Sequence, residues 1–145
     1  MQKMSKENLM CKQRLIAAAL TAFSIQSAGA TEIAAEWTFD DFASVFNFRL
    51  DLQSTDVAGV YTLNGYMELP VGGKPREAVV GSATYSPNED VFAVSLFFNS
   101  NSGESFTIGA NLDPVTLSGD GTEIRVTGGV VGSEKTGILA VVPIE

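Results

Sequence analysis

The chain has 145 residues, and its first thirty read as a removable leader, which leaves roughly 115 residues for one small domain. Beyond residue 30 it carries five basic and sixteen acidic side chains, a net charge of −11, with neither histidine nor cysteine. Such a chain repels phosphate backbones, so nucleic-acid binding is not expected. Without imidazole or thiol it offers no zinc, haem or Ser-His-Asp chemistry, and no metal site, cofactor or catalytic residue is assigned.

The amino-terminal segment is typical of a secretory signal peptide. Residues 1–14 are basic, residues 15–25 form an uncharged apolar run, and Ser27-Ala28-Gly29-Ala30 ends in small residues. This order predicts cleavage after Ala30. Eleven apolar residues are too few to span a bilayer, so we expect no membrane span in the mature chain. We therefore predict a signal peptide over residues 1–30 and one exported domain over residues 31–145, periplasmic or extracellular and without disulfides.

Alternation with a period of two dominates the mature chain and predicts half-buried strands. Every second residue is apolar in Phe46–Gln53, in Phe106–Leu112 and in the run that contains Ile124 and Val126. In that last run we expect Glu123 and Arg125 to face solvent. The segment Val91–Phe98 is apolar on both faces, which predicts either the most buried strand or one whose outer face meets a partner. For Thr31–Ala35 the sequence leaves two alternatives open, a loose arm or a short helical turn.

The segment around Asn64-Gly65 is compatible with either a hairpin or one continuous strand. Asn64-Gly65 is a strong hairpin signal. A hairpin there would place Glu68 beside Tyr61 and Leu63, whereas one continuous strand keeps Tyr61, Leu63, Gly65, Met67 and Leu69 on a single face. We therefore predict one long strand that bends at Gly65.

Turn signals recur at short intervals and leave no room for crossover helices, so neighbouring strands should be antiparallel. They include Pro70–Pro75, Ser86–Asp90, Asn99–Ser105, Ser118–Gly121 and Gly132–Thr136.

Glycines within strands favour a closed sheet. We assign Gly65, Gly81, Gly109 and Gly128 to inward positions, where a missing side chain permits a sharp bend. The fold class predicted is all-β, a small antiparallel up-and-down β-barrel of about eight strands, with a β-sandwich as the alternative. The architecture is like that of lipocalins and avidins. Trp37 follows Ala35-Glu36, however, so the glycine-x-tryptophan start of a lipocalin is absent, and the likeness of architecture carries no function.

Aromatic side chains at inward positions predict an apolar ligand pocket. The predicted ligand-binding residues are Trp37, Phe46, Phe48, Tyr61, Phe92, Phe98 and Phe106. The function predicted is a non-catalytic binding protein for an apolar small molecule. Two alternatives remain open: a protein- or glycan-binding module with a filled core, and an enzyme that acts only by positioning a reactive substrate, as a cyclase or isomerase can.

Overall fold

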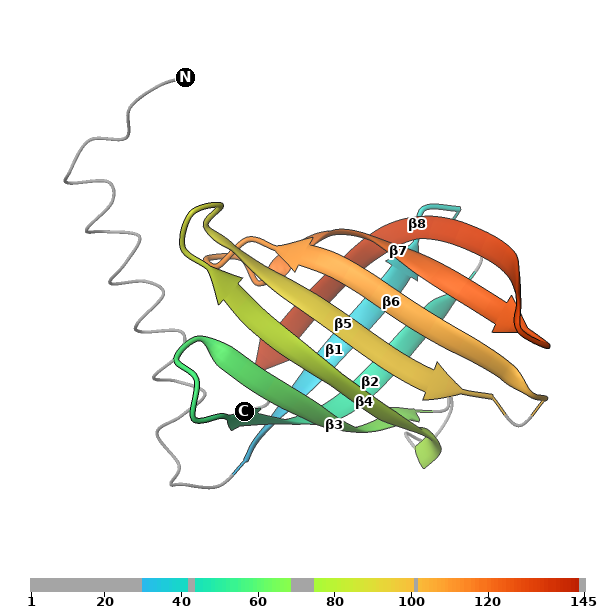
Figure 1. Cartoon of the computed structure of the whole chain (residues 1–145), viewed down its shortest axis with the longest axis horizontal. Coiled ribbons are helices and arrows are strands. Elements are labelled where there is room, and N and C mark those ends of the chain that lie inside the picture. The colour runs from blue at the N-terminus through green and yellow to red at the C-terminus, as the bar shows by residue number, and fades with distance from the viewer. Residues whose placement is uncertain (1–29, 42–43, 69–74, 101, 144–145) are drawn as a thin grey trace, which may run out of the picture.

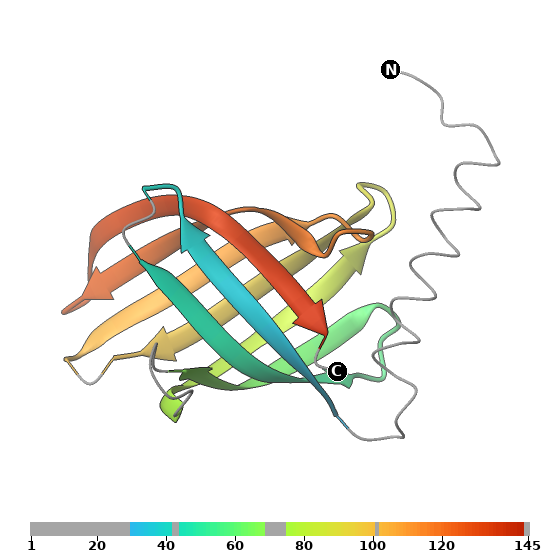
Figure 2. The ribbon, with the colours of Figure 1, turned by 180° about the vertical axis from the view of Figure 1, so that it is seen from behind.

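The computed structural model describes residues 30–41, 44–68, 75–100 and 102–143 of the chain. They form eight strands: β1 (Thr31–Phe39), β2 (Val45–Ser54), β3 (Val60–Glu68), β4 (Pro75–Ser86), β5 (Val91–Asn99), β6 (Glu104–Leu112), β7 (Ser118–Thr127) and β8 (Val130–Pro143). Each strand pairs antiparallel with the next, and β8 pairs with β1 (Figure 1). Figure 2 shows β1 lying between β2 and β8 where the sheet closes. The predicted all-β, eight-stranded barrel is confirmed.

The described residues contain no helix that is long and apolar enough to cross a bilayer. The predicted signal peptide, apart from Ala30, lies outside the described residues, as does the turn at residues 70–74. The segment Thr31–Ala35 is the first half of β1, so both alternatives, a loose arm and a short helical turn, were wrong.

On β2, β3 and β6 the inward faces follow the alternation read from the sequence. β2 buries Phe48 and Leu50, and β6 alternates in the same way. β3 is continuous through Asn64 and Gly65, so the long strand is confirmed and the hairpin is rejected. The outer face of β5 is open to solvent and Phe97 is 41% exposed, so β5 is not buried on both faces, and a partner on its outer face stays a prediction. β5 is therefore a half-buried strand.

Glycines allow the closest approaches between strands. A Cβ on Gly65 would stand 1.9 Å from the carbonyl oxygen of Arg49, and one on Gly81 would stand 2.1 Å from that of Ser95. Both inward assignments agree with the structure. The other two were wrong: Gly109 is flanked by the inward Ile108 and Ala110 and has open space at its Cβ position.

Gly128 belongs to a turn and not to a strand. Gly128 and Gly129 both have positive φ, 58° and 79°, and join Thr127 to Val130 as a two-residue hairpin connection. Two consecutive residues with positive φ are what a type I′ turn requires, and glycine adopts them without strain. The expected turns at Ser118–Gly121 and Gly132–Thr136 are instead parts of β7 and β8. The β7–β8 register shifts between Arg125 and Val126, leaving Gly132 unpaired in a β-bulge.

Substitution of Gly65 tests the close approach of β2 and β3. Gly65→Ala should lower the free energy of unfolding by about 1–3 kcal/mol, because its methyl group collides with backbone that cannot move without breaking the ladder. Gly109→Ala is the matched control and should leave stability unchanged or raise it by up to about 1 kcal/mol, since nothing lies within 4 Å of its Cβ. Urea denaturation measures both. Equal losses in the two variants would contradict the assigned role of Gly65.

Candidate functional site

The barrel has two unlike ends. The end at which β2–β3, β4–β5 and β6–β7 are connected is called here the cavity end. The end that carries the Gly128–Gly129 turn is called the hairpin end. Each strand runs from one end of the barrel to the other, so the inward residues of one strand contribute to both ends.

The seven predicted ligand-binding residues lie on inward faces, but they do not form one pocket. Trp37, Phe48, Phe92, Phe98 and Phe106 are buried, and Phe46 and Tyr61 are partly buried against the core. Only Tyr61 and Phe92 line the cavity at the cavity end. The ligand-binding role of all seven stays a prediction.

The other predicted aromatic residues pack against one another at the hairpin end. Phe46 contacts Phe39 and Phe98 edge to face, with ring centroids 5.2 and 5.8 Å apart. Phe98 and Phe106 are stacked, with centroids 4.9 Å apart and an interplanar angle of 5°. Trp37 is fully buried and meets Phe39 edge to face. These rings, the aromatic cluster, fill this part of the interior, each pair adding about 0.5–1.5 kcal/mol to the burial of its area.

An apolar cavity of about 50 Å³ opens at the cavity end. It is lined by Ile33, Ala35, Leu50, Leu52, Tyr61, Leu63, Ala83, Phe92, Val94, Leu96, Leu112, Leu117, Leu139 and Val141. Its lining contains no ionisable side chain except Tyr61, and burial raises the pKa of the Tyr61 phenol. A cavity with so few polar groups holds water poorly and favours apolar atoms.

Leu117 reaches the cavity from the connection between β6 and β7. Its φ of 54° is a left-handed conformation, which costs a residue with a Cβ about 1–2 kcal/mol. The backbone holds it there, because Leu117 N donates to the carbonyl oxygen of Asp113 and its own oxygen accepts from Val141 N, both at 2.8 Å. The Asp113 carboxylate accepts from the amides of Val115 and Thr116. An ordered turn thus presents Leu117 to the cavity.

The interior of β7 is charged, which corrects the sequence prediction. Glu123 is 0% exposed, while Ile124, expected inside, is 37% exposed. Glu123 is paired with Ile108, and Arg125 with Phe106, on the inward face of the neighbouring β6. Both charged residues therefore point into the barrel.

Two glycines explain why β7 turns this face inward. Gly119 and Gly121 share the face of Glu123, and a Cβ on them would stand 1.9 Å from Asn111 O and 2.4 Å from Gly109 O. A shift by one residue would bring Asp120 and Thr122 into that space. The signal in the sequence was the two-residue spacing of Gly119, Gly121 and Glu123, together with the Gly-Gly turn. The apolar residues Ile124 and Val126, taken alone, predict that the opposite face of β7 points inward.

Few interactions compensate for the burial of the Glu123 carboxylate. Neither carboxylate oxygen has a hydrogen bond, and the nearest charge is Arg125, whose Nη2 lies 3.6 Å from Oε1. Desolvation raises the pKa of Glu123, and the positive charges of Arg125 and Lys135 oppose this rise only in part. Glu104 adds a further upward contribution to this pKa. A carboxylate in such surroundings favours its neutral form or a cationic neighbour.

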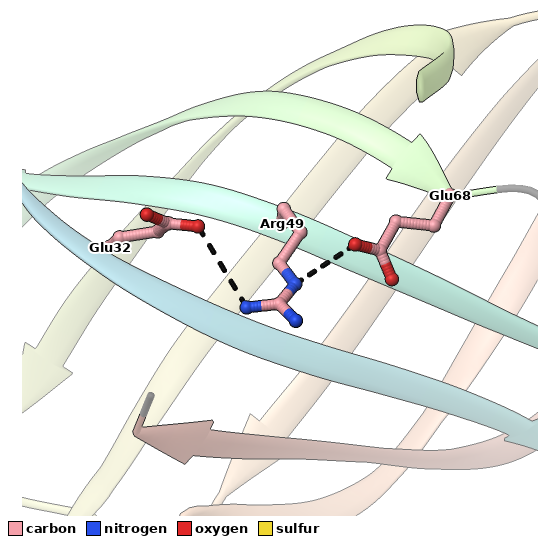
Figure 3. Close-up of polar contacts among 3 residues, drawn as sticks. All are labelled: Glu32, Arg49 and Glu68. Atoms are coloured by element: carbon pink, nitrogen blue, oxygen red, sulfur yellow. Dashed lines mark hydrogen bonds and ion pairs between the residues drawn. The ribbon is translucent and has the colours of Figure 1, made fainter. Parts of the chain in front are cut away.

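Other charged residues, Arg49, Asp40 and Asp41, form ion pairs or hydrogen bonds outside the interior of the barrel. Arg49 lies outside the barrel and donates from Nε to Glu68 at 2.9 Å, while its Nη1 lies 3.8 Å from Glu32 (Figure 3). This ion pair network links β1, β2 and β3 and contributes about 0–1 kcal/mol per pair. Asp40 accepts a hydrogen bond from Thr136, and Asp41 lies 3.9 Å from Lys135. Within the described ranges, no group of acidic side chains is placed to hold a metal ion.

No protein-family model matches the chain, and a search of curated proteins finds no match.

The raised pKa of Glu123 can be tested by measuring how a Glu123 substitution changes the pH dependence of stability. Because its folded pKa is raised, the folded state holds the proton to higher pH than the unfolded chain. Wild-type stability should therefore fall as pH rises from the ordinary value of 4.5 through the folded pKa. Glu123→Gln keeps the shape and does not titrate, so its stability relative to wild type should increase over that interval. Urea denaturation from about pH 4 to about pH 8 measures it. A difference that stays constant with pH would contradict the raised pKa.

Proposed function

We propose that this protein is an exported binding protein that takes a small apolar molecule into the cavity end of its barrel. The observation that carries the proposal is the cavity lined by aliphatic side chains, Phe92 and Tyr61. An interior of this kind excludes ions. Burial of apolar surface in it is favourable by about 25 cal/mol for each Å² removed from water. The lining supplies no acid or base for catalysis apart from the Tyr61 phenol.

The size of the cavity supports a slender ligand. About 50 Å³ holds only a few atoms, and the aromatic cluster closes the interior beyond it. An aliphatic chain end or a small alicyclic compound fits this space better than a flat aromatic system. Leucine side chains dominate the lining, and they can change rotamer to widen it. The Tyr61 hydroxyl offers one hydrogen bond to a ligand with a polar end.

A second candidate function rests on the outer wall. A broad hollow of about 720 Å³ crosses β5 to β8. Its polar lining includes Ser95, Asn111, Asp120, Thr122 and Thr136. The hydroxyl and amide side chains of this lining, together with the carboxylates of Asp40 and Asp120, offer hydrogen-bonding groups for a glycan. Binding of a glycan that Gly109→Arg abolishes, with the cavity unaffected, would favour this function over the first.

Filling the cavity tests the proposed function. Ala83 lines the cavity, and Ala83→Val adds two carbon atoms inside it. This variant should weaken the binding of a fluorescent aliphatic probe at least about tenfold while leaving thermal stability equal or higher. Ala78→Val is the control, because Ala78 lies on the exposed face of the same strand. The proposal fails if wild-type protein neither binds such probes nor yields an apolar compound on solvent extraction.

Export can be measured separately. Expression of the full chain in a bacterium should give a periplasmic or secreted protein that begins at Thr31, because cleavage after Ala30 leaves β1 intact. Intact mass and amino-terminal sequencing identify the first residue. An unprocessed chain recovered from the cytoplasm would contradict the proposed export.

A further inference from the structure

At the hairpin end, the interior contains a three-sided site for a positive charge. The guanidinium carbon of Arg125 lies 4.7 Å from the centroid of the Phe106 ring. Glu123 and Glu104 flank it, with the nearest nitrogen–oxygen distances at 3.6 and 4.0 Å. Two carboxylates and the face of an aromatic ring are the groups that bind organic cations in proteins.

Arg125 occupies this site loosely. Its ion pairs with Glu123 and Glu104 are not hydrogen bonds, and its Nε is buried without a hydrogen-bond partner. Both oxygens of Glu123 likewise make no hydrogen bond, although that side chain is completely buried. The hydroxyl of Ser133, paired with Arg125 across the β7–β8 ladder, is a third buried group with no hydrogen bond. An ion pair without hydrogen bonds is weaker than the hydrogen-bonded pair that a guanidinium and a carboxylate can form.

The other nearby cation is directed elsewhere. Lys135 is paired with Glu123 in the β7–β8 register, but its Nζ lies over the Phe39 ring at 5.5 Å and 3.9 Å from Asp41. Its side chain is nearly half exposed. Arg125 is therefore the cation that lies against Glu123, and with about a third of its side chain exposed it has a route to solvent.

We propose that this site binds a small organic cation of the guanidinium or primary ammonium class, which displaces the Arg125 side chain toward solvent. A free donor can approach Glu123 at hydrogen-bonding distance, whereas the Arg125 guanidinium, which is tethered to β7, lies 3.6 Å away. The mature chain's surplus of acidic side chains attracts cations to the barrel. This site lies at the end of the barrel opposite the apolar cavity and does not depend on it.

The test uses methylguanidinium as the probe, in NMR titrations of the mature protein at constant ionic strength. Wild type should bind at millimolar concentration, because the resident side chain competes as an intramolecular ligand. Shifts should centre on Glu123, Phe106 and Glu104. Arg125→Met keeps an apolar chain over Phe106 and removes the competitor, so it should bind at least about tenfold tighter. Neutral urea, which resembles guanidinium in shape, should cause no such shifts.

Two further variants decide the outcome. Glu123→Gln should abolish the binding of methylguanidinium, whereas Glu32→Gln, on the outer wall beside Arg49, should leave it unchanged. Should Arg125→Met fail to fold, the wild-type and Glu123→Gln titrations still decide, since each stands alone. Absence of binding to wild type, or equal binding by wild type and Glu123→Gln, overturns the proposal. An Arg125→Met variant that folds but binds no tighter also overturns it.

Discussion

The structure depends on how closely the strands of an eight-stranded sheet approach when the sheet closes on itself. The interior of such a barrel is only just wide enough for its side chains, so some inward positions must lack one. Gly65 and Gly81 supply these positions on β3 and β4, and Gly119 and Gly121 supply them on β7. Gly137 does so beside Trp37, where a Cβ would stand 2.7 Å from the indole ring. These glycines favour the observed inward faces of β3, β4, β7 and β8.

This constraint explains why the interior contains charged side chains, which the hydrophobic pattern of the sequence does not predict. Once Gly119 and Gly121 face inward on β7, Glu123 and Arg125 must follow them, because side chains alternate strictly along a strand. The cost is the desolvation of a carboxylate that makes no hydrogen bond. Phe106 and Glu104 offset part of that cost by holding Arg125 against it. A sequence that keeps such a pair within a closed barrel bears a local penalty, and such penalties are commonest at binding sites.

The fold could be predicted from the sequence because the strong alternation in β2, β3 and β6 has one reading. Gly65 was placed correctly since the hairpin alternative mixed apolar and polar faces. The interior site could not be predicted in the same way. In β7, Ile124 and Val126 gave an apolar pattern that points outward, and the Gly128–Gly129 turn that sets the register was read as strand. The inward aromatic residues were identified, but alternation gives the face of a side chain and not its depth along the barrel. It could not separate Tyr61 and Phe92 at the cavity from Phe98 and Phe106 in the cluster.

The aromatic cluster divides the interior into two environments with opposite chemistry. On one side the lining is aliphatic and favours molecules that leave water readily. On the other side lie Glu123, Arg125 and Lys135, where a ligand must bring charge or hydrogen-bond donors. The stacked rings of Phe98 and Phe106 pack too tightly for a molecule to pass between the two. The two environments are therefore separate, and a ligand at one end need not exclude a ligand at the other. Coupling between them would have to pass through displacement of the rings, since Phe106 contacts Arg125 on one side and the cluster on the other.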